Sequence, residues 1–131
     1  MTIDWITRRE WLVANSTEIL LKQDVSRTGA VVLFELVPAA DFFITANNAD
    51  LFLLIRNDSF VDAVTIEAEV AGQIDTTKEE WKEATPIPVQ TACYTLGPYP
   101  ILNYGPDAHF RITAGDLTQI YIAILRLKRT L

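Results

Sequence analysis

The chain is poor in the residue types that build small catalytic and metal-binding sites. It contains one cysteine, Cys93, and one histidine, His109. A single cysteine excludes an intramolecular disulfide and leaves a zinc cluster unsupported. Cys93 lies in the apolar stretch TACYTL, where we expect it to be buried as a small hydrophobic side chain. The five glycines form neither a dinucleotide-binding nor a phosphate-binding motif, and we predict no cofactor and no bound metal.

Basic residues and long apolar runs are also scarce. Eleven Lys and Arg against seventeen Asp and Glu give a net charge of −6, which is the wrong sign for gripping a nucleic-acid backbone. No apolar stretch approaches the roughly 20 residues of a membrane helix, and the start of the chain lacks a signal-peptide pattern. We therefore expect no nucleic-acid partner, no membrane partner and synthesis in the cytoplasm.

Hydrophobic residues, in contrast, make up half of the 131 positions, while charged residues make up 21%. A chain of this length fits one compact domain with a real core. The apolar fraction is slightly high for a lone domain, which indicates that part of it is buried against other subunits.

Two stretches alternate with the period of a β-strand that has one wet face, residues 62–70 (DAVTIEAEV) and 108–113 (AHFRIT). The side chains predicted to point inward are Val64, Ile66, Ala68, Val70, Phe110 and Ile112. Those predicted to face water are Thr65, Glu67, Glu69, His109, Arg111 and Thr113.

Three further stretches are apolar on both faces: 31–37, 51–55 and 120–127. Such a strand lies either centrally between layers or at a subunit interface. Turn signals between the runs are those of a sandwich or barrel, and the AGD turn at 114–116 predicts a tight terminal hairpin between 108–113 and 117–127.

Helix is predicted in two places. The capping pattern at 77–83 (TKEEWKE) supports a short surface helix or a loop. The apolar residues within 3–13 form only part of a helical stripe, a pattern that fits a short helix and an extended arm equally. The chain is accordingly divided into an N-terminal arm or extension, 1–30, and a β-sandwich domain, 31–131.

Catalytic chemistry finds little support. His109 is predicted to be an ordinary surface residue, and the acidic pairs Glu67 with Glu69 and Glu79 with Glu80 fit solvated positions. We expect the protein not to be an enzyme.

Aromatic residues gather at the flanks: Trp5, Trp11, Phe42, Phe43 and Trp81. Tryptophan and tyrosine are favoured where partners meet, although local packing over a sandwich edge explains these positions equally well. The stretch 97–105 (GPYPILNYG) predicts a rigid corner between two strands, because its prolines cannot donate to a ladder. It brings Tyr99 and Tyr104 near one end of the domain, to pack locally or to meet a neighbouring subunit.

The order of the signals from Phe42 onward resembles a family of small decoration, or cement, proteins of tailed-bacteriophage capsids. The stretches that carry it are FFITANNADLFLLIRNDS, VTIEAEV, IPVQTACYTLGPYPILNYGPD and FRITAGDLTQIYIAILRL. The matching positions are Leu53, Ile55 and Asn57; Val64, Thr65 and Ile66; Gly97, Pro98, Tyr99, Pro100, Asn103 and Tyr104; and Ile122, Ala123, Leu125, Arg126 and Leu127. Tyr99 stands where phenylalanine is usual, and residues 1–40 have no counterpart.

The resemblance implies an all-β, antiparallel, jelly-roll-like β-sandwich that binds the exterior of a virion capsid, with the major capsid protein as partner and a homo-oligomer, favoured as a trimer. The protein would then be made in the host cytoplasm. Its candidate assembly-interface residues are Trp5, Ile6, Trp11, Leu12, Tyr99 and Tyr104. A rival hypothesis is a carbohydrate- or receptor-binding module of a phage fibre or tail, which would stack sugars on Tyr94, Tyr99, Tyr104 and Trp81.

Overall fold

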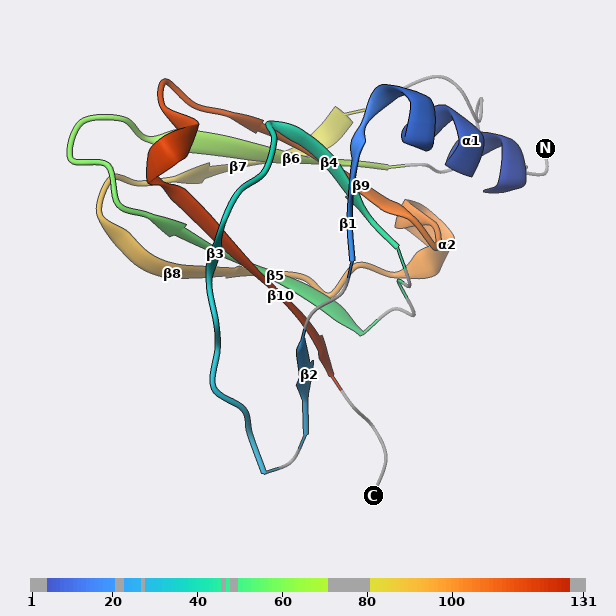
Figure 1. Cartoon of the computed structure of the whole chain (residues 1–131), viewed down its shortest axis with the longest axis horizontal. Coiled ribbons are helices and arrows are strands. Elements are labelled where there is room, and N and C mark those ends of the chain that lie inside the picture. Colours follow the sequence, from blue (N-terminus) through green and yellow to red (C-terminus); the bar gives the residue numbers. More distant parts are fainter. Residues whose placement is uncertain are drawn as a thin grey trace.

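The chain folds into two mixed β-sheets that face one another, with a helix on the outer side of one sheet (Figure 1). The computed structural model describes residues 5–20, 23–26, 28–45, 47, 50–70 and 81–127. Within these ranges, no helix is long and apolar enough to cross a membrane. The mostly β architecture agrees with the alternating sequence pattern.

Sheet A holds five strands, whose spatial order is β1 (Thr17–Ile19), β4 (Asp41–Ile44), β9 (Ala108–Thr113), β6 (Val64–Glu69) and β7 (Trp81–Ile87). Strand β1 runs parallel to β4, and the other pairs are antiparallel. Pro86 lies in β7, at the edge of the sheet, where a missing N–H donor is tolerated.

Sheet B is ordered β2 (Gln23–Val25), β10 (Ile120–Leu127), β5 (Leu51–Asn57) and β8 (Thr91–Leu96), and β3 (Glu35–Leu36) also pairs with β10. Strand β2 runs parallel to β10. The predicted antiparallel arrangement is therefore wrong for both sheets, each of which contains one parallel pair. Alternation along a strand reports which face is buried but not in which direction a neighbour runs, so the sequence carried no signal for these pairs.

The core lies between the sheets and contains the side chains predicted to point inward. Val64, Ile66 and Ala68 of β6 are at most 4% exposed, and Phe110 and Ile112 of β9 are at most 3% exposed. The rings of Phe42 and Phe110 stack with centroids 5.5 Å apart. Each fully buried side chain of this size contributes about 1.5–3 kcal/mol to folding, so this layer supplies much of the stability.

The predicted terminal hairpin is wrong. Strand β9 belongs to sheet A and β10 to sheet B, so the connection between them crosses from one sheet to the other. It passes through the 3-10 turn η1 (Leu117–Gln119), where the Asp116 side chain accepts a hydrogen bond from the Thr118 N–H. The AGD sequence marks the turn correctly but does not specify which strands it joins.

Three local predictions also need correction or fall outside the description. Within 31–37 only Glu35–Leu36 is a strand, and Val31 is 79% exposed. Of the helix predicted at 77–83, residues 77–80 lie outside the described residues, while 81–83 begin strand β7. Cys93 is exposed rather than buried, because it lies on edge strand β8.

The N-terminal segment is a helix, α1 (Trp5–Asn15), rather than an extended arm. Its buried residues Arg8 and Leu12 are four positions apart and therefore share one face. The helix ends where Asn15 donates its side-chain amide to the Trp11 carbonyl, and where the Ser16 N–H closes the last turn on Leu12. Strands β1 and β2, which follow directly, insert residues of the 1–30 segment into both sheets.

Candidate functional site

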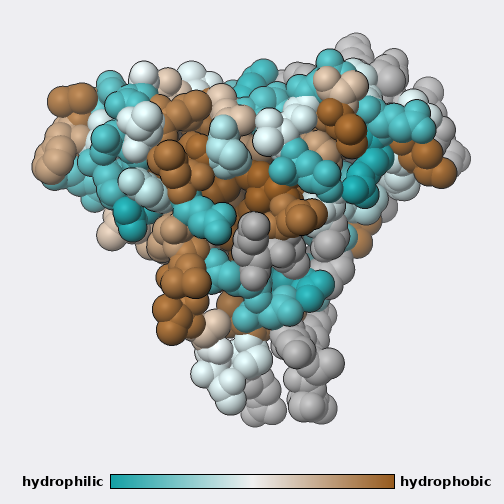
Figure 2. Space-filling view, viewed as in Figure 1, coloured by the Kyte–Doolittle hydropathy of each residue, from teal (hydrophilic) through white to brown (hydrophobic). Residues whose placement is uncertain are grey.

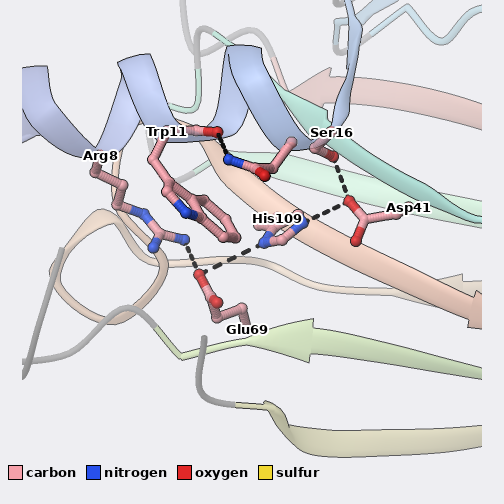
Figure 3. Close-up of polar contacts among 7 residues, drawn as sticks. Arg8, Trp11, Ser16, Asp41, Glu69 and His109 are labelled. Carbon is pink, nitrogen blue, oxygen red and sulfur yellow. Dashed lines mark hydrogen bonds and ion pairs between the residues drawn. The ribbon is translucent and has the colours of Figure 1, made fainter. Parts of the chain in front are cut away.

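Helix α1 covers the outer face of sheet A and buries a cluster of charged side chains there (Figure 3). Arg8 is 2% exposed, His109 1% and Glu69 0%. His109 and Glu69 do face away from the core, as predicted, but they do not face water. The prediction of a wet face is wrong for these two residues because α1 packs over it.

The cluster is a continuous chain of polar contacts. Arg8 donates from Nη2 to Oε1 of Glu69, and the same carboxylate oxygen lies 3.5 Å from Nδ1 of His109. On the other side of the ring, Nε2 of His109 is 2.7 Å from Oδ1 of Asp41, which also accepts the Ser16 hydroxyl. The two ring nitrogens of His109 therefore face two carboxylates, those of Glu69 and Asp41.

The pKa of Glu69 reflects the electrostatics of the cluster. Burial raises the pKa of the Glu69 carboxyl, but hydrogen bonds from His109 and Arg8 and the charge of Arg8 outweigh burial, and the pKa is lowered overall. Trp11 closes the cluster from above, its ring meeting the His109 ring edge-on with centroids 6.0 Å apart. The arrangement holds Glu69 ionised inside the protein.

A second arginine of α1, Arg9, forms ion pairs at the edge of the contact between α1 and the rest of the chain. Arg9 lies 3.2 Å from Glu18 and 3.4 Å from Asp107, measured between nitrogen and carboxylate oxygen. Burial raises the pKa of the Asp107 carboxyl, and the charge of Arg9 opposes that rise only in part. Charged groups thus tie α1 to the body of the protein at its centre and its rim.

The order of the contacts does not suit nucleophilic catalysis. A serine nucleophile gives its proton to a histidine that a carboxylate orients. Here the carboxylate of Asp41 stands between Ser16 and His109, and the His109 side chain is fully shielded from solvent. Among the described residues, no three His, Cys, Asp or Glu side chains are grouped to hold a metal ion. What the cluster can do is fix α1 on the sheet.

The predicted assembly residues fall into different environments. On α1, Leu12 is fully buried, Trp5 and Trp11 are half-buried, and Ile6 is 74% exposed. Trp5 packs so closely on Gly105 that a Cβ there would lie 2.4 Å from its ring. Most of the helical candidates therefore face the protein's own body, and Ile6 faces outward.

Tyr99 and Tyr104 are each 6% exposed. Tyr99 precedes α2 (Ile101–Tyr104) and Tyr104 ends it, in the corner that carries the chain from β8 to β9, and their rings meet edge-on with centroids 5.0 Å apart. Asn47 holds this corner by donating to the carbonyls of Tyr99 and Gly105 at 3.0 and 2.8 Å. The predicted corner between two strands is confirmed, and both tyrosines pack locally.

The tyrosines proposed as a sugar-stacking platform do not form one surface. Tyr99 and Tyr104 are buried, and Tyr94 packs against the core from strand β8. The Trp81 side chain lies outside what the structure describes. The three tyrosines therefore give the sugar-binding hypothesis no stacking platform.

A further apolar surface lies where β1, β2, β3 and β10 meet. The sequence pattern predicted only its 31–37 segment. From here on, we use the word arm for residues 28–34 alone and not for the N-terminal segment. The arm projects at the bottom of Figure 1 between β2 and β3. Beside it is a recess of about 90 Å³ between the edges of the two sheets. The recess is lined by Ile19, Gln23, Leu33, Glu35, Leu36, Pro38, Ile122, Ala123 and Ile124. We call the arm and the recess together the open edge.

The exposure of the open edge is high. Val31 is 79% exposed, Leu33 64% and Leu36 50%. Figure 2 shows apolar atoms gathered in the middle of this face and along the projecting arm. The stretch 31–37 was predicted to lie either between layers or at a subunit interface, and the exposure of Val31, Leu33 and Leu36 shows that these three side chains do not lie between the layers.

Comparison with known proteins gives no relative: no protein-family model, no curated protein and no solved structure matches the chain.

Proposed function

We propose that this protein is a structural component of a tailed-bacteriophage virion that decorates the capsid exterior and stabilises it by bridging capsid subunits. The major capsid protein is its partner, and the protein itself associates into a homo-oligomer, with a trimer favoured. In this proposal the two sheets are a variant of the jelly-roll-like sandwich, and the protein has no enzymatic role.

The observation that carries the proposal is the distribution of exposed apolar side chains. They occupy separate extremities of the molecule instead of one cleft (Figures 1 and 2). Phe60 and Val61, in the loop between β5 and β6, are 78% and 82% exposed. Val31 on the arm is 79% exposed, and Ile6 on α1 is 74% exposed. A protein that bridges neighbours needs such separated contact surfaces, since each contacts a different partner.

One of the residues that carry the resemblance, Asn57, has a structural role. Asn57, which ends β5, is fully buried and donates to the carbonyls of Asp62 and Pro88 at 3.0 and 3.1 Å. Its side-chain oxygen accepts the Ser59 N–H at 3.0 Å. The asparagine of the motif therefore ties two loops at one end of the sheets, and it is a framework residue rather than a binding residue.

The test is binding to shells assembled from the major capsid protein encoded in the same genome. We expect the purified chain to co-sediment with these shells in saturable amounts and to raise the temperature at which they disassemble. A chain that stays in the supernatant and leaves shell stability unchanged would contradict the proposal.

A further inference from the structure

A hollow of about 490 Å³ lies at the end of the two sheets where three connections come together, at the left of Figure 1. Its walls come from the end of β5 and the loop that follows, from the turn between β7 and β8, and from η1. Sites for small molecules occupy roughly 300–1,000 Å³. The recess beside the arm, about 90 Å³, and a gap of about 140 Å³ next to Tyr99 and Tyr104 are smaller than that. Of these three hollows, only the first has the size of a ligand site.

Hydrogen bonds between the three connections fix the walls of the hollow. The Gln90 N–H donates to the Ser59 carbonyl at 3.0 Å, which joins the turn between β7 and β8 to the loop after β5. The Asp58 N–H donates to the Gln119 carbonyl at 2.9 Å, which joins the same loop to η1. The hollow is therefore formed before a ligand arrives, and a ligand loses little affinity to ordering its walls.

Two irregularities of the backbone lie at the hollow. Gln90 has φ +53° and is the only non-glycine residue with a positive φ among those that the structure describes. Next to it, two residues of β8, Ala92 and Cys93, lie opposite the single residue Arg56 of β5, which is the pattern of a β-bulge. Bulges and strained backbone are concentrated at binding and active sites. Because glycine would relieve the strain at position 90, the glutamine there indicates a use for its side chain.

The walls carry hydrogen-bonding groups but no net charge. Arg56 is bound to Asp58 through two contacts of 3.0 Å each, and its guanidinium lies 4.2 Å from the centre of the Tyr121 ring. The side-chain amides of Gln90 and Gln119 form no hydrogen bond with another described residue. An ionic ligand would find the charges of the hollow already paired, whereas an uncharged polar ligand would find two amides available.

An amide pair beside an exposed aromatic ring matches the chemistry of a sugar. Each sugar hydroxyl both donates and accepts hydrogen bonds, and an amide side chain offers a donor and an acceptor side by side. The C–H groups of a sugar ring form an apolar face that packs on an aromatic ring, and Phe60, which lines the hollow, is 78% exposed. A purely apolar ligand would leave the amides without partners.

We propose that this hollow binds an uncharged carbohydrate, with Phe60 packed on the face of a sugar ring and Gln90 and Gln119 hydrogen-bonded to its hydroxyl groups. Tyr94, Tyr99 and Tyr104, the tyrosines of the sugar-binding hypothesis above, do not line it. The inference goes beyond the proposed function, since it assigns one exposed extremity of the molecule to a carbohydrate. It is tested without shells.

The first experiment measures binding of the labelled full-length chain to an array of uncharged oligosaccharides and their sialylated counterparts. We expect saturable binding to uncharged members, weakened roughly tenfold or more by Phe60→Ala. Val61→Ala is the matched control, since Val61 is the next residue of the loop, is 82% exposed and does not line the hollow. Binding to no uncharged member, binding confined to sialylated members, or equal weakening by both variants would overturn the proposal.

A second variant, Gln90→Gly, separates binding from folding. Glycine adopts φ +53° without strain, so the variant should unfold at the same temperature as the wild type or at a higher one. It removes the amide and should weaken binding to the same oligosaccharides roughly fivefold or more. Binding as tight as that of the wild type would show that the amide does not contact the sugar.

The contact is located by NMR, with the oligosaccharide that the array retains most strongly added to isotopically labelled chain. The side-chain amide signals of Gln90 and Gln119 should shift, while that of Gln23, whose amide donates to the Leu33 carbonyl, should not. Shifts confined to residues away from the hollow would contradict the placement of the site.

The shell assay separates the two proposals. A chain that binds shells but no carbohydrate removes this inference and keeps the proposed function. A chain that binds an oligosaccharide through Phe60 but ignores shells removes the proposed function and leaves this inference intact.

Discussion

The interface beneath α1 and the open edge are nearly opposite in composition and exposure. Under α1, the charged side chains of Arg8, Glu69 and His109 are shielded from water, while at the open edge Val31 and Leu33 face it. Buried charge is costly unless it is paired, and exposed apolar surface is unfavourable unless it is covered. The first surface is covered within one chain, whereas the second presents its apolar side chains to solvent.

The comparison separates stability from association. Substitutions beneath α1 should change the free energy of unfolding, because the groups there have no access to solvent that could replace a lost partner. Substitutions on the arm should change what the protein binds and leave its folding intact. The following predictions test that division.

The largest effect is expected for Glu69→Gln. It leaves the buried Arg8 guanidinium without a compensating charge, and breaking a buried pair in this way costs about 3–5 kcal/mol. Denaturant unfolding measures the loss. The control is Glu67→Gln on the same strand. The Glu67 carboxylate lies 2.8 Å from the guanidinium of Arg111, whose side chain is 39% exposed, so losing this ion pair should cost no more than about 1 kcal/mol. Equal losses would show that burial beneath α1 is not decisive.

Gly105→Ala should follow, with a loss of about 2–4 kcal/mol. Gly105 has φ +77° and ψ +173°, a backbone region that is essentially restricted to glycine, and an added Cβ would lie 2.4 Å from the Trp5 ring, so both backbone strain and overpacking apply. Gly29→Ala on the arm is the matched control, because Gly29 has φ +83° with no atom within 4 Å of the added Cβ. It should cost only about 1–2 kcal/mol from the backbone term. Thermal unfolding of both variants measures the difference, and a loss in Gly105→Ala no larger than that in Gly29→Ala would contradict the packing of Trp5 on Gly105.

Acid should weaken the interface beneath α1 through Glu69. A carboxyl group whose pKa is lowered on folding contributes stability above its ordinary value of 4.5, and this contribution disappears as the pH falls through the folded pKa. Asp107 acts in the opposite sense, since burial raises its pKa above 3.8 and its unfavourable contribution is relieved on acidification. Unfolding measured below pH 4.5 should therefore depend less steeply on pH in Glu69→Gln than in the wild type, and more steeply in Asp107→Asn. Parallel curves for all three proteins would rule out these assignments.

The smallest effect on folding is expected for Val31→Ser. The side chain is 79% exposed, so the free energy of unfolding of the dilute protein should change by no more than about 0.5 kcal/mol. The measurement is denaturant unfolding at a concentration below that of self-association, since association would add its own stabilisation. A loss well above 1 kcal/mol would mean that the arm belongs to the folding core and not to an interface.

The sequence predicted the buried faces of the strands well, and it predicted their neighbours poorly. Val64, Ile66, Phe110 and Ile112 point into the core as their alternation indicates. Alternation is a local property of each strand, set by the two-residue repeat of the backbone. Pairing between β2 and β10, or between β1 and β4, depends on contacts between distant segments and leaves no local pattern.

The same limit explains why His109 and Glu69 were wrongly predicted to face water. Their alternation placed them correctly on the outer face, but only the packing of α1 decides that this face is dry. The N-terminal pattern was equally compatible with a helix and an extended segment. The sequence therefore gave no reason to place a helix over His109 and Glu69, and both were predicted to be surface residues. An arginine at position 8, between Trp5 and Leu12 on one helical face, was the available signal for a buried counter-charge.

The pairing of β10 with both β2 and β5 has a consequence for how the chain acquires its structure. Strand β10 is the central element of sheet B, yet it comes from the last described residues, about one hundred positions after β2. During synthesis β2, β3 and β5 emerge long before the strand that joins them, so sheet B is completed only after residues 120–127 have left the ribosome. Contacts of such sequence separation make folding slow, and β2, β3 and the edge of β5 that does not face β8 remain unpaired in the meantime. A nascent chain that stops before Ile120 has no centre for sheet B and should be prone to aggregate.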